Sequence, residues 1–210
     1  MKYLFNVFRS TSLLLLSVWL TGALAAAGQN FNLSSIKFTV ENTSVISILG
    51  SSTVGPFRCD SKAISGGGRA GLEHEVSGDP FVEAQLVTDV AAFDCKNGKI
   101  TSDLHKALKQ VEYPQLSLSI DAGFARSATE DEAGDYVVRV AGMLNIAGVE
   151  KRFDVTLAAV RESFLTFKLT GSHDVIMTDF GIDPPSALLG LIKTRDKITI
   201  DFNLMLSPTF

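Results

Sequence analysis

The 210-residue sequence is poor in the patterns that build metal and redox sites. It has two cysteines, Cys59 and Cys95, and no Cys-x-x-C pair. Its three histidines, His74, His105 and His173, are at least 31 residues apart along the chain, so no spacing typical of metal ligands is present. The sequence therefore predicts no metal site.

Recognisable catalytic motifs are absent too. No Gly-x-Ser-x-Gly nucleophile motif occurs, and the run Gly66–Gly68 is not followed by the Lys-Ser or Lys-Thr of a phosphate-binding loop. The adjacent carboxylates of Glu130, Asp131 and Glu132 are typical of a solvated loop. These absences predict a protein that is not an enzyme and has no catalytic residues.

Basic clusters with interleaved aromatic residues are also missing. The chain carries 19 basic and 23 acidic residues, a formal net charge of −4. The first 27 residues hold two basic and no acidic residues, so the remainder has 17 basic and 23 acidic residues and a net charge of −6. This charge argues against nucleic-acid binding.

Only one long apolar run occurs, Leu13–Leu24, and it follows two basic residues near the start of the chain. The run is short for a membrane span, and small residues follow it as at a signal-peptidase site. We predict that residues 1–27 are a cleaved secretory signal, cut after Ala25 or Ala27. Residues 28–210 are then one domain. An uncleaved N-terminal anchor is the alternative.

Export places the protein in the periplasm or outside the cell. In such an oxidising compartment Cys59 and Cys95 are expected to form a disulfide. Closing a loop of about 36 residues stabilises a fold by roughly 3–4 kcal/mol in the chain-entropy model.

Segments in which apolar and polar residues alternate dominate the rest of the chain, as in half-buried β-strands. In the segment Asp135–Ile146, Val138 and Leu144 fall on the same face. Ala147-Gly148, directly after this segment, is a two-residue hairpin signal. The predicted strands are Ile36–Val40, Val45–Ser52, Phe57–Ile64, Phe81–Ala92, Gln115–Ala122, Asp135–Ile146, Lys151–Arg161, Phe164–Met177 and Lys197–Leu206.

One amphipathic helix is predicted among these strands, over Ile100–Val111. Thr101 or Ser102 can cap its start, and Pro114 prevents its continuation. The apolar stripe at a period of 3.6 residues consists of Ile100, Leu104, Ala107, Leu108 and Val111.

The pattern indicates an all-β protein, an extended antiparallel β-barrel of about eight strands with this helix as a cap at one end. A second, short helical segment is predicted at Ala187–Ile192 and a Gly-rich polar connection over Ser65–Pro80. Strands this long can build a barrel with room for a ligand. The residues expected to bind it are Ile46, Ile48, Leu116, Leu118, Val138, Val140, Leu165, Phe167 and Leu169, with Leu104 and Leu108 at the lid.

Several short stretches match a known family in their order and spacing. They are Gly50–Val54, Phe57–Cys59, Phe93–Cys95, Leu104–Lys109 with Tyr113-Pro114, Val140–Val149, Met177–Ile182 and Ile198–Leu206. On these residues the chain resembles the YceI-like family of exported bacterial proteins, also described as polyisoprenoid-binding, over roughly Ile36 to Leu206. The resemblance implies a lipocalin-like barrel whose apolar interior holds a long isoprenoid or a similar amphiphile, and it implies no catalytic residues.

The expected function is that of an exported, non-catalytic carrier of a long-chain apolar ligand. The expected ligand is a polyisoprenoid or another isoprenoid, an isoprenoid quinone, or a fatty-acid-like lipid. No other cofactor is expected. Contact with a membrane would be transient, and the sequence leaves open whether the protein is a homodimer. The alternatives are a cell-envelope protein–protein interaction module with a filled barrel, and a lipid-modifying enzyme in which His105 or His173 faces the cavity.

Overall fold

The computed structural model describes residues 35–71, 81–127, 135–163, 166–187 and 191–209. The expected signal segment, with both candidate cleavage sites, lies outside these residues. No helix within the described ranges has the length and apolar character that a membrane span needs.

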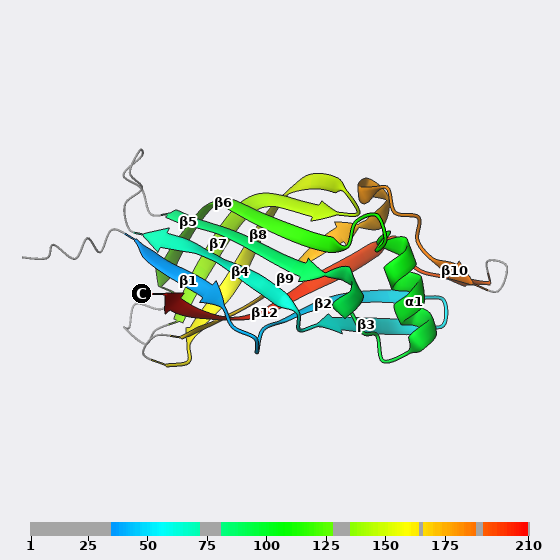
Figure 1. The fold of residues 1–210 in the computed structure, drawn as a ribbon, viewed down its shortest axis with the longest axis horizontal. Coiled ribbons are helices and arrows are strands. Elements are labelled where there is room, and N and C mark those ends of the chain that lie inside the picture. Colours follow the sequence, from blue (N-terminus) through cyan, green and yellow to red (C-terminus); the bar gives the residue numbers. More distant parts are fainter. Residues whose placement is uncertain (1–34, 72–80, 128–134, 164–165, 188–190, 210) are drawn as a thin grey trace, which may run out of the picture. The chain divides into compact units, whose positions relative to one another are not determined.

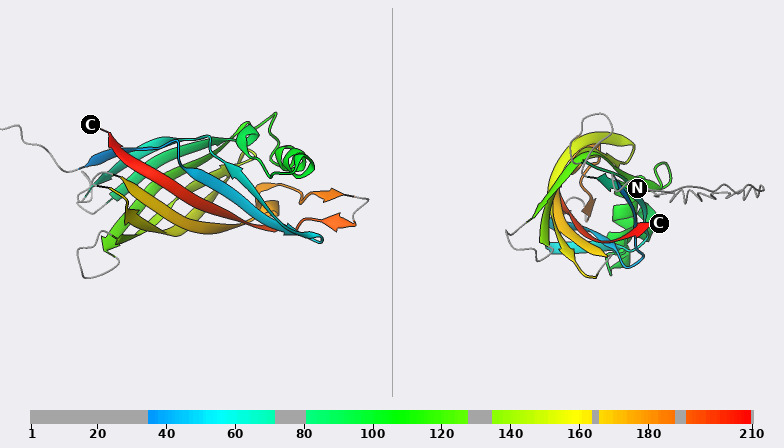
Figure 2. Two further views of the ribbon diagram at one scale, coloured as in Figure 1. Left: turned by 90° about the horizontal axis from the view of Figure 1, so that it is seen from below. Right: turned by 90° about the vertical axis from the view of Figure 1, so that its left-hand side faces the viewer.

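Eight antiparallel strands form a closed ring around an apolar interior (Figures 1 and 2). The ring closes where β1 pairs with the end of β12, with Lys37 opposite Thr209. This arrangement confirms the predicted fold class, an antiparallel β-barrel. In order around the ring the strands are β1 (Ile36–Val40), β4 (Ile64–Gly71), β5 (Phe81–Asp89), β6 (Gln115–Ser127), β7 (Asp135–Ile146), β8 (Val149–Arg161), β9 (Phe167–Ile176) and β12 (Lys197–Thr209).

A hairpin extends the sheet at the end of the barrel that carries the α-helix (Figure 2). β2 (Val45–Ser52) pairs with the first half of β12, and β3 (Gly55–Ser61) pairs with β2. β3 is the last strand in the sheet order. Among the described residues, its outer edge is joined only by an isolated bridge between Asp60 and Asp94.

The predicted disulfide between Cys59 and Cys95 crosses this edge. Cys59 lies in β3, whereas Cys95 lies between the 3-10 helix η1 (Val90–Ala92) and the helix α1 (Gly98–Ala107). Beside the disulfide, Asp60 and Asp94 exchange backbone N–H to O hydrogen bonds of 3.0 and 2.9 Å. The disulfide therefore ties the segment that leads into α1 to the outer edge of β3.

The alternation predicted for the long strands is present in the structure. Most inward-facing residues of β7, β8 and β12 are buried, and the residues between them are partly or fully exposed. The two-residue hairpin is confirmed, because Ile146 pairs with Val149 while Ala147 and Gly148 have φ of 50° and 80°. A type I′ turn needs positive φ at both central residues.

β6 is longer than predicted and contains a bulge. It continues to Ser127 instead of stopping at Ala122, and its register against β7 shifts between Ile120 and Ala122. A bulge inserts one extra residue and so exchanges the inward and outward faces of the strand beyond it. Ala125 faces the interior for this reason.

The Gly-rich stretch begins as a strand and not as the predicted polar connection. The predicted strand Phe57–Ile64 ends at Ser61, and β4 starts at Ile64 and runs through three successive glycines. A Cβ added to Gly66 would lie 2.0 Å from the carbonyl oxygen of Gln85 in β5. The glycines thus permit a close approach of two strands. The remainder of the predicted connection, residues 72–80, lies outside the described residues.

The start of α1 differs from the prediction. Asn97 caps the helix, because its side chain accepts hydrogen bonds from the backbone N–H groups of Lys99 and Ile100. The prediction of Thr101 or Ser102 as the cap was wrong, since the helix already begins at Gly98.

The end of the helix also comes earlier than predicted. α1 stops at Ala107, and Lys109 has a positive φ of 53° that turns the chain away. Leu108 is buried, but Val111 is 97% exposed and does not belong to the apolar stripe.

The second helical segment is not where the sequence placed it. Instead of a helix at Ala187–Ile192, the ends of this segment form a small hairpin of β10 (Ser186–Ala187) and β11 (Ile192–Lys193). A short 3-10 helix, η2 (Met177–Phe180), occurs before it. Proline favours extended backbone in the residue before it, so two consecutive prolines also suit the entry to a strand.

Candidate functional site

A cavity of about 630 Å³ lies inside the barrel at the end where β12 finishes. All eight strands of the ring contribute to its walls, and nearly all of the lining side chains are aliphatic or aromatic. We call it the main cavity. It is lined by Ile36, Phe38, Ala70, Val82, Ala84, Leu86, Leu118, Ile120, Ala125, Tyr136, Val138, Val140, Val155, Leu157, Ala159, Arg161, Phe167, Leu169, Phe202, Leu204, Leu206, Ser207 and Pro208.

The main cavity exists because several inward positions carry small side chains. Ala70, Ala84, Ala125 and Ala159 face it from four different strands. The interior of an eight-stranded barrel is just wide enough for ordinary side chains to fill it. Alanine at these positions leaves volume that leucine or phenylalanine would occupy.

The main cavity opens at the end of the barrel away from α1. Ile36 is 55% exposed at this opening, and Arg161 is exposed as well. The guanidinium carbon of Arg161 lies 5.5 Å from the centroid of the Phe167 ring, within the range of a cation–π contact. The rings of Tyr136 and Phe167 meet edge to face at 6.1 Å. The opening thus combines apolar surface with a positive charge at its rim.

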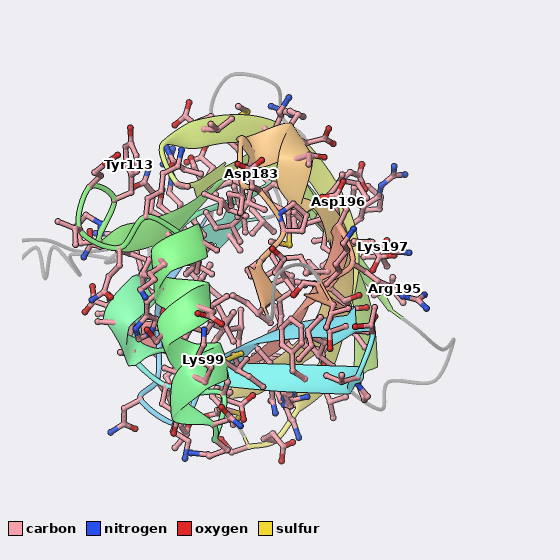
Figure 3. All side chains as sticks on the ribbon, turned by 90° about the vertical axis from the view of Figure 1, so that its right-hand side faces the viewer. Lys99, Tyr113, Asp183, Arg195, Asp196 and Lys197 are labelled. Carbon is pink, nitrogen blue, oxygen red and sulfur yellow. A yellow bond between two sulfur atoms is a disulfide. The ribbon has the colours of Figure 1, made fainter. Side chains whose placement is uncertain are left out.

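A second cavity of about 200 Å³ lies beneath α1 at the other end of the barrel, and we call it the minor cavity. Ile100, Leu104, Ala107 and Leu108 cover it from the helix and its C-cap. Figure 3 views this end, with α1 along one side of it and charged side chains at its periphery. The labelled charged residues there are Lys99, Asp183, Arg195, Asp196 and Lys197.

The structure distributes the predicted ligand-binding residues over both cavities. Those that line the main cavity are Leu118, Val138, Val140, Phe167 and Leu169. Those that line the minor cavity are Ile48, Leu104, Leu108 and Leu116. Ile46 is buried but lines neither cavity, and Leu165 lies outside the described residues. Contact of these residues with a ligand stays a prediction.

Of the 23 residues that line the main cavity, sequence reasoning named five and missed 18. Phe202, Leu204 and Leu206 alternate clearly in β12 and could have been named from that signal. Ala125 could not, because the bulge in β6 reverses the alternation. The contributions of β1, β4 and β5 depend on the pairing order of the sheet, which the sequence does not show.

The two histidines among the described residues, His105 and His173, make contacts outside both cavities. Nε2 of His105 lies 3.0 Å from the backbone oxygen of Phe93, and the ring of His173 packs edge on against Phe153 at 5.9 Å between centroids. Among the described residues, neither histidine lines the main or the minor cavity. The walls of the main cavity can therefore hold an apolar chain, but the described part of them offers no acid–base pair.

Charged pairs lie on the outside of the barrel. On the outer face of β7 and β8, Nη2 of Arg139 is 2.8 Å from the carboxylate of Asp154, and this hydrogen bond lowers the pKa of Asp154. At the end of the barrel that carries α1, Thr178 donates to Asp196 from its hydroxyl at 2.6 Å and from its backbone N–H at 2.9 Å. These bonds lower the pKa of Asp196. Ionised groups are thus held in water while the interior stays apolar.

Solved structures share this fold at low sequence identity. BcnA of Burkholderia cenocepacia is 18% identical with a TM-score of 0.59, and the match covers 79% of this chain and 98% of that one. A domain from Saccharophagus degradans, described as polyisoprenoid binding and implicated in plant cell wall breakdown, is 16% identical with a TM-score of 0.62. That match covers 83% of this chain and 99% of the other.

Sequence comparison gives a family but no individual counterpart. No curated protein matches the chain significantly. The model of the YceI-like domain matches residues 20–206, which include every described strand of the barrel except the last residues of β12. The chain belongs to the YceI-like family.

Proposed function

We propose that the protein binds the apolar tail of a long-chain lipid inside the main cavity and carries it without chemical change. The observation that carries this proposal is a space of about 630 Å³ enclosed almost entirely by aliphatic and aromatic side chains. Such a space stays poorly hydrated, because water needs polar partners that these walls do not offer. An apolar ligand is the occupant that fits it.

The size of the main cavity defines the length of tail that it takes. If each carbon group of the tail occupies about the volume of a water molecule, about 30 Å³, then about 20 carbon groups fit into 630 Å³. This corresponds to about four isoprene units or to a long acyl chain. Burial of each methylene contributes about 0.8 kcal/mol, so fifteen of them give about 12 kcal/mol before the costs of association are subtracted.

Membership of the YceI-like family and the likeness in fold to a domain described as polyisoprenoid binding support an isoprenoid tail. An isoprenoid quinone and a fatty-acid-like lipid fit the same walls. The protein is proposed to act in the periplasm or outside the cell, to exchange its ligand in transient contact with a membrane, and to bind no nucleic acid.

The direct test is to analyse the protein as purified under native conditions. Native mass spectrometry should detect an adduct, and organic extraction followed by mass spectrometry should identify a lipid with an apolar tail of about 15–20 carbons. Extracted protein should then bind farnesol or palmitate added in solution. Recovery of no lipid, together with no binding of either compound, would contradict the proposal.

The two alternatives predict different results. A protein–protein interaction module would use exposed apolar residues such as Val54 and Leu191, which are 73% and 78% exposed, and would not need an open interior. An enzyme that modifies a lipid would need a polar group beside the bound chain. Substitution of His105 or His173 by glutamine should therefore leave lipid binding nearly unchanged if the protein is a carrier.

A further inference from the structure

The main and minor cavities are separated by a layer of buried side chains across the barrel. Along β7, Val140 lines the main cavity and Ile146 the minor cavity, whereas Leu144 between them lines neither. Along β8, Val155 lines the main cavity and the next inward residue, Phe153, lines neither. On these two strands a buried residue therefore lies between the two cavities. On β6 and β12 the layer is thinner, because the consecutive inward residues Leu118 and Leu116, and Phe202 and Ile200, line the main and the minor cavity respectively.

Other strands contribute to the same layer. Ile46 of β2 and Ile64 of β4 are buried and line neither cavity. Ser61 of β3 and Thr88 of β5 are also buried there, with their hydroxyl oxygens 2.9 Å apart in a hydrogen bond. This bond satisfies the polar groups of the layer internally, so the layer does not need water or a ligand to complete it.

Phe153 is the largest side chain of this layer and is 4% exposed. Its partner across the β7–β8 pair is Gly142, which has no side chain to share the space. A Cβ added to Gly142 would lie 1.9 Å from the carbonyl oxygen of Ser119 in β6, so this position cannot hold a side chain, and the ring of Phe153 packs against His173 on the neighbouring strand. Removal of the ring would therefore open the layer more than removal of any other single side chain in it.

We propose that the buried layer that contains Phe153 sets the length of the apolar tail that the protein accepts, with the Phe153 ring filling the space behind the inner end of the main cavity. This inference rests on the proposed function, because it assumes that a tail occupies the main cavity. A tail of up to about 20 carbons ends at this layer, and a longer one leaves its remainder outside the opening. Without the ring, the tail continues into the minor cavity, which adds room for about seven more carbon groups.

The test measures how affinity depends on chain length in a series of prenols. Lipid-free protein is titrated with farnesol, geranylgeraniol and geranylfarnesol, which have 15, 20 and 25 carbons, by displacement of a bound fluorescent naphthalene sulfonate. For the wild-type protein, Kd should fall strongly from 15 to 20 carbons and then stay constant, since the last isoprene unit is not buried. For Phe153→Ala, Kd should fall at least another tenfold from 20 to 25 carbons, because each buried methylene is worth about fourfold.

Two further variants make the test decisive. Phe167→Ala removes the same ring at the opening of the main cavity, so it should weaken binding of every prenol but leave the plateau at 20 carbons. Phe153→Leu makes a smaller hole and is the replacement for Phe153→Ala if the latter unfolds, as thermal denaturation will show. For Phe153→Leu, Kd should also fall from 20 to 25 carbons, by at least threefold.

The possible failures point to different errors. Wild-type protein that binds geranylfarnesol tenfold more tightly than geranylgeraniol would contradict a closed inner end, whether or not any variant folds. Folded variants at position 153 that keep the wild-type plateau would contradict the role of Phe153 alone. If the wild-type protein binds none of the three prenols, an isoprenoid tail is excluded and the inference about Phe153 fails. If it does not bind palmitate either, the proposed function fails as well.

Discussion

Replacing Ala159 with leucine distinguishes a barrel with an open interior from a filled one. Ala159 is buried and faces the main cavity from β8, with Tyr136 and Leu169 opposite it on the two neighbouring strands. Leucine adds three carbon groups, or about 90 Å³ at about 30 Å³ per group. This is about one seventh of the 630 Å³ that the cavity offers.

The variant should therefore lose affinity and gain stability. Loss of room for about three methylenes weakens binding of a chain that fills the cavity by about 2 kcal/mol, or about thirtyfold in Kd. The new apolar contacts raise the free energy of unfolding of the lipid-free protein by about 0.5–2 kcal/mol, as other cavity-filling substitutions do. Prenol displacement measures the first quantity, and urea denaturation of extracted protein measures the second.

The neighbouring residue supplies a matched control. Ala158 is exposed on the outer face of the same strand, so Ala158→Leu should change both quantities by less than about 0.5 kcal/mol. If Ala159→Leu instead destabilises the lipid-free protein by about 1–3 kcal/mol, the side chain has been forced into a filled core, and the reasoning from an open cavity is refuted.

Two other predictions concern the end of the barrel that carries α1. Replacing Cys59 and Cys95 together by serine removes the disulfide, and the midpoint of urea denaturation should fall by an amount that corresponds to roughly 3–4 kcal/mol; an unchanged midpoint would contradict a stabilising role. The hydrogen bonds from Thr178 hold the pKa of Asp196 below its ordinary value of 3.8. The ionised carboxylate therefore stabilises the fold fully above pH 3.8, and this stabilisation is lost as the pH falls through the lowered pKa. Asp196→Asn should accordingly melt at a lower temperature than the wild-type protein at pH 7, and the difference should shrink as the pH is lowered below 3.8; a difference that stays constant from pH 7 to pH 2 would exclude this cause.

The parts of the fold that sequence reasoning recovered depend on local patterns. The period of two in β7, β8 and β12 predicts which side chains are buried, and Ala147-Gly148 predicts a turn that needs positive φ at two residues. The disulfide followed from the number of cysteines and the expected export. The strand and turn inferences need only residues that are neighbours in the chain. The disulfide needs only the fact that the sequence has two cysteines, so that a single pairing is possible.

The parts that it missed depend on contacts between distant segments. The glycines of β4 looked like a loop, but they allow the backbone of β5 to approach closely, which no local signal reveals. The bulge beside Asp121 reverses the face of β6 without an evident mark in the sequence. The division of the interior by Phe153 likewise depends on which residues of other strands reach the same level of the barrel.

The closure of the ring through β12 has a consequence for the order of folding. β1 finds its second partner only in Leu206–Thr209, some 170 residues later in the chain. Loop closure over such a separation delays folding, because the entropy cost is incurred before the contacts form. A chain that is being synthesised therefore has no complete barrel until its last strand has emerged. For the export that the sequence predicts, this delay would keep the chain in a form that can still cross a membrane.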